Sequence, residues 1–314
     1  MTVNTVYGLE SRILFHILMN RDHFWDQNPG LRVISQVKNI YWRKKDILGK
    51  FKFSYWFVGG KDQGTIKTED EIQGIRKACR MAREILDFAS AMVVEGVFTD
   101  DIDRYIHRLC AIKSVFPATL NYYGFPKSVC TSINEVACHG IPDNNVLSAG
   151  DLLKIDLGIY CDGYFGDVCE TYMVIFESDV ELMMITHTAL TKAISICKPG
   201  TKIKMIGKTI QKYLEKLDCR TLVNLTGHGI GRNFHEPPFV PHEENDSDVV
   251  MEPGMVFTIE PIVTRSKSNS FMMWPDGWTI TTIDGSKTAQ FEHTILITKD
   301  GHEVLTENFI IFQD

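Results

Sequence analysis

Apolar residues recur with a helical period from residue 68 onwards. Thr68 and Glu71 have the spacing of a capping box, in which each side chain accepts a hydrogen bond from the other residue's backbone amide, so a helix should begin here. Apolar positions then recur every three or four residues from Ile72 as far as Val94. A second run of the same kind predicts another helix that starts near Thr99.

The period changes to two near residue 128, which indicates strands. Aliphatic residues at 153, 155, 157 and 159 alternate with positions that include Lys154 and Asp156, so Asp156 should lie on the face opposite the aliphatic side chains. Asp162-Gly163 is a turn sequence, and a second strand that carries Asp167 follows it. Residues 156–167 should therefore form a hairpin that brings two carboxylates close together.

Two further helices are predicted at about 179–197 and 202–217, with Pro199-Gly200 between them. Strands return after residue 227, and Glu260 and Glu292 lie in two of them. The order helix–helix–strands thus occurs twice. This repetition favours an α+β fold of two related halves around a common sheet.

Composition narrows the class of protein. The chain has 314 residues, of which 44% are hydrophobic and 23% charged, and its net charge of −7 argues against nucleic-acid binding by the whole chain. None of the eight cysteines forms a Cys-x-x-Cys pair, which argues against a zinc ribbon or a thioredoxin-type motif. No apolar stretch has the length of a membrane span, and early acidic residues argue against a cleaved targeting peptide. We therefore expect a cytoplasmic protein with reduced thiols and no membrane partner.

Five residues in short, distinctive contexts are the strongest candidates for chemistry: Asp156, Asp167, His228, Glu260 and Glu292. Four carboxylates and one imidazole suit Mn, Fe, Co or Zn ions. Acids packed together without cations would repel one another, so their convergence would call for cations, and two ions sharing carboxylates would make a two-metal hydrolytic site. Taken singly, each acid could equally be a solvated strand or turn residue.

The remaining motifs are weaker. The glycines of Gly227-His228-Gly229-Ile230-Gly231 indicate a crowded backbone around a ligating imidazole rather than a phosphate loop, because no helical pattern follows. Two prolines follow His235-Glu236, so this histidine does not lie on a zincin helix. His139 is the remaining histidine best placed for proton or substrate work, although a single loop histidine is more often structural.

Together and in this order, the motifs resemble one family. The segment from about 67 to 311 is similar to a type I methionine aminopeptidase of the pita-bread (creatinase/aminopeptidase) fold, in which two pseudo-symmetric halves surround a central, mostly antiparallel, curved sheet. The matching stretches are LNYYGFPKSVCTSINEVACHGIPD (120–143), KIDLGIYCDGYFGD (154–167), GHGIG (227–231), FHEPP (234–238), IEP (259–261) and DGWTITTIDGSKTAQFEHT (276–294).

The resemblance implies a dimetal site. Two divalent ions (Co, Mn, Fe or Zn) would be held by five ligands, with Asp167 and Glu292 bridging both ions. Asp156 would bind one ion, and His228 and Glu260 would complete the shell of the other. Glu260 would also carry protons to and from the attacking water.

Further catalytic and ion-binding roles follow from the same resemblance. His235 would hydrogen-bond the scissile peptide, and His139 would contact the substrate near the leaving amine. A monovalent-cation site would be built mostly from backbone carbonyls near Asn134 and Val136, with Thr288 opposite.

The resemblance also implies a pocket for methionine. Aromatic rings and one soft sulfur suit a polarizable thioether, although core packing would explain the same side chains. Thr119 lies at a position of the pocket wall where relatives vary. The side chains expected around the methionine are Tyr122, Phe125, Cys130, Phe234 and Trp278.

The amino terminus departs from the family pattern. Residues 1–66 would be an extension and 67–314 the catalytic domain. No cysteine precedes Cys79, so the extension lacks the zinc-binding module of some relatives. The extension is basic and aromatic, which is compatible with docking near the ribosome. We favour a strap packed against the catalytic domain, because many of its residues are large and apolar.

Three functions compete. The first is a monomeric methionine aminopeptidase acting on nascent polypeptides or short peptides that start with Met and have a small second residue. The second is an X-Pro peptidase such as aminopeptidase P or prolidase, which shares the five ligands but differs around them. The third is a non-catalytic binding protein of the same fold, for which loss of ligands would be the expected trace.

Overall fold

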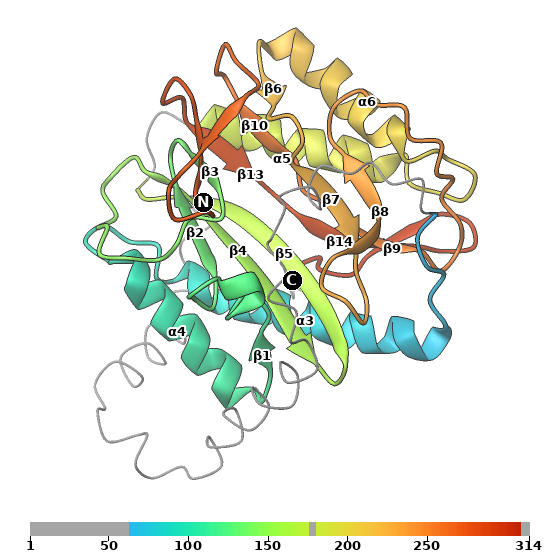
Figure 1. Cartoon of the computed structure of the whole chain (residues 1–314), viewed down its shortest axis with the longest axis horizontal. Coiled ribbons are helices and arrows are strands. Elements are labelled where there is room, and N and C mark those ends of the chain that lie inside the picture. Colours follow the sequence, from blue (N-terminus) through green and yellow to red (C-terminus); the bar gives the residue numbers. More distant parts are fainter. Residues whose placement is uncertain (1–62, 176–179, 309–314) are drawn as a thin grey trace, which may run out of the picture.

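The computed structural model describes residues 63–175 and 180–308. The expected extension therefore lies outside the described residues except for positions 63–66. Within the described parts, two helix pairs flank a set of antiparallel strands (Figure 1). None of these helices is both long enough and apolar enough to cross a membrane.

The first helix pair forms where the sequence predicts it. Helix α3 (Glu69–Ser90) begins with the expected capping box, because Glu71 N–H donates to the Thr68 hydroxyl and the Glu71 carboxylate accepts from Thr68 N–H. Helix α4 spans Thr99–Ile112. A short 3-10 turn, η5 (Tyr122–Gly124), lies in the loop that follows β1.

The second helix pair is also confirmed, with slightly shorter bounds. Helix α5 spans Val180–Ser195, and helix α6 spans Lys204–Leu214 before the 3-10 turn η6 (Glu215–Leu217). Figure 1 shows α3 and α4 on one side of the strands and α5 and α6 on the other.

The predicted hairpin is the longest strand pair. Strand β4 (Leu152–Cys161) and strand β5 (Tyr164–Met173) pair antiparallel across the turn at Asp162 and Gly163. The four aliphatic side chains at 153, 155, 157 and 159 are fully buried. Strands β1 (Phe116–Pro117) and β2 (Cys130–Ile133) pair antiparallel with successive stretches of β4, at residues 159–160 and 153–156 respectively.

Three more antiparallel sheets complete the strand layer, which confirms the mostly antiparallel arrangement. The longest has the order β15-β14-β9-β7-β8, and the others are β13-β10-β6 and β11-β12-β3. Their strands are β3 (Val136–Cys138), β6 (Arg220–Thr221), β7 (Thr226–Gly229), β8 (Glu236–Pro241), β9 (Val256–Ile259), β10 (Ile262–Thr264), β11 (Phe271–Met273), β12 (Ile280–Thr282), β13 (Thr288–Gln290), β14 (His293–Ile297) and β15 (His302–Val304).

Each helix pair has its own hydrophobic core. The core of the first half packs α3 and α4 against β4 and β5, and includes Ile85, Ile106 and Leu157. The core of the second half packs α5 and α6 against the later strands, and includes Ile206 and Phe257. Two separately buried cores agree with two related halves, each made of a helix pair and strands.

The halves meet along a seam beside β5. Glu292 does not lie inside a strand, as the sequence predicted, but in the break between β13 and β14, where it forms an isolated bridge with Cys169 of β5. The Thr294 hydroxyl donates to the backbone oxygen of Asp167 at 2.8 Å. Glu260 likewise follows the end of β9 instead of lying within it. These strand ends free both glutamates to face the seam.

Candidate active site

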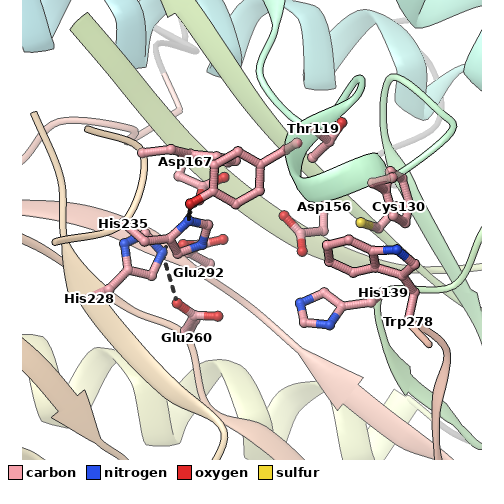
Figure 2. A pocket seen from close by; sticks show the side chains of 13 residues that line it. Thr119, Cys130, His139, Asp156, Asp167, His228, His235, Glu260, Trp278 and Glu292 are labelled. Atoms are coloured by element: carbon pink, nitrogen blue, oxygen red, sulfur yellow. Dashed lines mark hydrogen bonds and ion pairs between the residues drawn. The ribbon is translucent and has the colours of Figure 1, made fainter. Parts of the chain in front are cut away.

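The five candidate ligands converge on this seam. Asp156 and Asp167 come from β4 and β5 of the first half, whereas His228, Glu260 and Glu292 come from β7 and the ends of strands in the second half. All five line one open cavity and face one another across it (Figure 2). The site is therefore complete only when both halves are folded against each other.

Their donor atoms fall into overlapping groups. Asp156, Asp167 and Glu292 form one group, and His228, Glu260 and Glu292 form another, with donor atoms within 4.8 Å of one another in each. His228 Nε2 lies 3.6 Å from both Asp167 Oδ2 and Glu260 Oε1. Ligands bound to a divalent ion at about 2.1 Å lie about 3–4 Å apart, so the spacing fits metal coordination.

Electrostatics also favours cations at this place. Burial, followed by the charges of Asp167 and Glu260, raises the pKa of Asp156 well above its ordinary value. Burial and the same two carboxylates raise the pKa of Glu292 well above its ordinary value, and burial raises the pKa of Glu260 to about 7. Asp167 Oδ1 and Glu292 Oε1 are buried and have no hydrogen-bond partner among the described residues. Repelling acids with unpaired lone pairs fit divalent cations.

The imidazole of His228 is oriented for ligation. Its Nδ1 lies 3.1 Å from the backbone oxygen of Gly229, which can only accept, so the ring proton belongs on Nδ1 and the Nε2 lone pair faces the acids. Burial alone would lower the pKa of His228, but the ion pairs with Asp167 and Glu260 together raise it. A bound cation would take the place of the additional proton.

Close backbone approach explains the glycines beside this histidine. A Cβ atom on Gly227 would collide with the backbone oxygen of Thr258, and one on Gly229 would collide with that of Pro237. The interpretation of these glycines as crowded backbone is therefore confirmed, and the crowding comes from the neighbouring strands β8 and β9.

Glu260 is held by three groups. The Thr258 hydroxyl donates to its Oε1 at 2.8 Å, and Gln290 Nε2 donates to its Oε2 at 3.4 Å. The backbone N–H of Glu260 donates to His242 Nε2 at 3.1 Å, which places the ring proton of His242 on Nδ1, beside the backbone oxygen of Leu225. Sequence reasoning missed this role of His242, because the contact joins segments 18 residues apart and no local motif marks it.

The two other candidate histidines line the same cavity. His235 Nδ1 lies 2.8 Å from the Tyr122 hydroxyl, and burial lowers the pKa of His235 well below its ordinary value. Burial lowers the pKa of His139 to about 4, and its φ of 54° lies in the left-handed region. Both rings are therefore neutral near pH 7. His235 also forms a third donor group with Asp167 and His228.

The five side chains expected around methionine line the cavity as well, together with Thr119. The rings of Phe125 and Trp278 meet edge to face at 5.2 Å. Phe234 packs over Gly158, where a Cβ atom would collide with its ring. An apolar wall of aromatic rings thus adjoins the acidic cluster, so a bound apolar side chain would lie beside the candidate metal ligands.

The expected monovalent-cation site holds a lysine instead. Lys154 Nζ donates to the backbone oxygens of Asn134 and Thr288 and to the Thr288 hydroxyl, at 2.8, 3.0 and 2.8 Å respectively. The residues present therefore do not fit a bound monovalent ion, and that expectation is corrected. Lys154 was visible in the sequence on the same strand face as Asp156, but its partners lie on distant segments.

The chain is similar to known metallopeptidases over most of its length. The family model "Metallopeptidase family M24" matches residues 73–299. Methionine aminopeptidase 1 of Saccharomyces cerevisiae is 45% identical over 245 residues, which cover 77% of this chain and 63% of the yeast protein. The chain thus spans less than two thirds of the length of that relative.

Solved structures agree with this assignment. A methionine aminopeptidase from Rickettsia prowazekii superimposes with a TM-score of 0.76 at 40% identity, covering 78% of this chain and 100% of the other. A prolidase from Pyrococcus furiosus gives a TM-score of 0.61 at 25% identity, covering 79% and 67%. Fold and site together define a metallopeptidase of the pita-bread fold. The chain belongs to metallopeptidase family M24 and, within it, to the methionine aminopeptidases.

Proposed function

We propose that this protein removes the N-terminal methionine from nascent proteins and from peptides whose second residue is small, as a metal-dependent exopeptidase. The observation that carries the proposal is that one cavity is lined both by the five candidate ligands and by the five candidate methionine-binding side chains. A substrate with its side chain in the aromatic part would present its first peptide bond to the acidic part.

The donor groups support a pair of divalent ions with shared ligands. Asp167 and Glu292 each belong to one group with Asp156 and to another group with His228. We therefore infer that these two carboxylates would contribute to holding both ions. Asp156 would complete one shell, and His228 and Glu260 the other. Co, Mn, Fe and Zn all suit this set of oxygen and nitrogen donors.

Two divalent ions held there would lower the pKa of water and stabilise negative charge on a peptide oxygen. We assign Glu260 as the proton carrier, because its carboxylate faces the other candidate ligands in the cavity and a positioned carboxylate can take a proton from water. The hydrogen bonds from Thr258 and Gln290 hold both of its oxygens in place. Glu260 would take a proton from the attacking water and pass it to the leaving amine.

The neutral histidines would act on the substrate itself. The hydrogen bond with Tyr122 fixes the ring of His235, which would hydrogen-bond the scissile peptide. His139 lies at the opposite side of the cavity, near Trp278, at a ring distance of 6.0 Å (Figure 2). Neutral rings can donate a hydrogen bond to a developing oxyanion without adding charge to the metal site.

An activity assay tests the proposal directly. Metal-stripped protein should not cleave Met-Ala-Ser, and titration with Mn, Fe, Co or Zn ions should restore release of methionine. Asp156→Asn should lower the restored rate by at least about 100-fold. Asp162→Asn is the matched control, because Asp162 lies exposed in the turn of the same hairpin. Folded, metal-replenished protein that releases no methionine would refute the proposal.

The X-Pro peptidase alternative has the structural similarity to prolidase in its favour. Identity is higher to the methionine aminopeptidase structure, at 40% against 25%, and the aromatic pocket suits methionine. Cleavage of a Gly-Pro substrate without cleavage of Met-Ala-Ser would support the alternative. A non-catalytic binding protein would be expected to have lost ligands, whereas all five ligands and both histidines are present.

We further propose that residues 1–66 form a strap rather than a ribosome-docking segment. Where the chain is described, Gln63 Nε2 donates to the Glu252 carboxylate at 2.8 Å, and the Thr65 hydroxyl donates to Glu236 at 3.0 Å. Deletion of residues 1–62 leaves these contacts in place. An insoluble product would support the strap, whereas an active, stable product that no longer co-sediments with ribosomes would support docking.

We also propose that the protein is a cytoplasmic monomer. All eight cysteines are buried free thiols, which suits a reducing compartment. Sedimentation of the purified full-length chain should give the mass of a single copy, and cell fractionation should recover it with cytosolic markers.

A further inference from the structure

A buried ammonium group lies beside the metal site. Lys154 is only 1% exposed, and its three hydrogen bonds end on Asn134 and Thr288. The Thr288 hydroxyl in turn lies 2.9 Å from the backbone oxygen of Asn134 and 3.2 Å from that of Val136, and it donates its proton to one of them. The oxygens around Lys154 Nζ therefore have no proton to offer to it.

This pattern fits the charged form of the lysine. Burial disfavours the ammonium and lowers the pKa of Lys154 to about 7. A neutral amine has only two N–H bonds for three acceptors and would turn its lone pair towards an oxygen. An ammonium satisfies all three acceptors at 2.8–3.0 Å.

A set of neutral oxygens is also what a sodium or potassium ion binds in proteins. Such ions replace their hydration shell with backbone carbonyls and hydroxyls, which here are supplied by Asn134, Val136 and Thr288. The oxygens thus favour a positive charge at their centre. In this chain the charge is the ammonium group of Lys154, which is covalently attached and cannot leave the site as a free ion can.

The ammonium joins three segments that carry the site. Lys154 precedes the ligand Asp156 by two residues on β4. Asn134 lies in the turn between β2, which begins at Cys130, and β3, which is followed by His139. Thr288 begins β13 in the other half of the fold, four residues before Glu292.

We infer that Lys154 is a positioning residue that acts as a tethered replacement for a monovalent cation, holding together the strand of Asp156, the loop of His139 and strand β13, which precedes Glu292. The protein should therefore be indifferent to sodium and potassium. The inference rests on the proposed dimetal function for its catalytic meaning, but the structural clamp can be tested without any activity.

The first test measures the Tm of the wild-type chain by thermal unfolding in EDTA. At equal ionic strength, Tm should agree within about 1 °C in potassium, sodium and tetramethylammonium chloride, since the last cation is too large for the oxygens. A Tm several degrees higher in potassium or sodium would overturn the inference without any variant.

The second test removes the ammonium with Lys154→Ala. Loss of the buried charge should lower Tm by about 10 °C. Potassium or sodium should recover at least half of that loss, and tetramethylammonium should recover none. Lys287→Ala is the matched control for the loss of a nearby positive charge, because Lys287 donates to the backbone oxygen of Gly150. Equal responses of Lys154→Ala to all three salts would refute the inference.

Affinity for a divalent ion shows whether Lys154 positions the candidate metal ligands. Calorimetric titration with Co²⁺ should show a Kd raised about 10- to 100-fold in Lys154→Ala, with recovery in potassium chloride. Lys154→Met, which is similar in length and fills the space, should lose affinity without recovery. If the salt pattern holds but Met-Ala-Ser is not cleaved by wild type, the clamp stands and the proposed function fails. If Lys154→Ala does not fold in any salt, the wild-type comparison decides alone.

Discussion

Replacing Glu260 by glutamine tests whether buried acids make the metal-free site unstable. The change removes a titrating group and keeps the shape of the side chain. Burial raises the pKa of Glu260 from 4.5 to about 7 in the folded chain. A raised pKa means that the folded state binds the proton more tightly than the unfolded state. This stabilisation is full below a pH of about 4.5 and is lost as the pH rises through about 7.

The magnitude follows from the same two values. Linkage gives about 2.5 kcal/mol of stabilisation at about pH 5 and almost none at about pH 8.5. The side chain of Glu260 is 19% exposed, and it interacts with other acids that also titrate, so we expect about 1.5–2.5 kcal/mol. Glutamine cannot ionise. The stability of metal-free Glu260→Gln relative to wild type should therefore rise by this amount between the two pH values.

Urea denaturation in EDTA at both pH values measures the effect. Glu215→Gln serves as the control, because Glu215 is exposed and lies away from the cavity. Saturation with Co²⁺ at about pH 8.5 should reverse the order, since the proposed ligand Glu260 would hold the ion in wild type and glutamine would hold it less tightly. A stability difference between Glu260→Gln and wild type that is the same at both pH values would refute the reasoning.

Three more variants probe separate parts of the molecule. His235→Ala should lower kcat/KM for Met-Ala-Ser about 100- to 1,000-fold in steady-state assays and leave Co²⁺ affinity nearly unchanged in calorimetry; a large loss of affinity would make His235 a ligand instead. Gly158→Ala should raise KM about tenfold, because its methyl group displaces the Phe234 ring. Arg83→Met should lower the urea-derived free energy of unfolding by about 3 kcal/mol, because the half-buried carboxylates of Glu170 and Asp87 lose their cation, while kcat of the folded fraction stays near wild type.

Local signals made much of the fold predictable. The capping box of Thr68 and Glu71 marked the start of α3, and the alternation around Asp156 marked β4 and its buried face. These features depend on neighbours within one turn or one strand. Strand ends were less predictable, since the break that frees Glu292 is set by its bridge to Cys169, 123 positions away in the sequence.

The candidate site was likewise predictable from the sequence only in part. Residue type and the family resemblance named the five side chains that the structure brings to one cavity. Two contacts were not predicted: the hydrogen bond from the backbone N–H of Glu260 to His242, and the hydrogen bonds from Lys154 to backbone oxygens. Both contacts join segments that are distant in sequence, whereas hydrophobic patterns and secondary-structure propensities describe one segment at a time. A single buried histidine or a single lysine in a strand also belongs to no recognisable motif.

The seam between the halves explains why the site needs positive charge in two forms. Asp156 and Asp167 belong to the half cored by α3 and α4, whereas Glu260 and Glu292 belong to the half cored by α5 and α6. Without cations, these acids would repel one another across the seam, against the hydrophobic cluster that packs Ile75 and Phe165 of the first half on Val256 and Leu296 of the second. Divalent ions would convert the repulsion into a cross-link that can be gained and lost, whereas Lys154 supplies a permanent link beside it. Metal loading should therefore tighten the contact between the halves without changing either core, so hydrogen exchange should slow at the Cys169–Glu292 bridge and remain unchanged in the middle of α3 and α5.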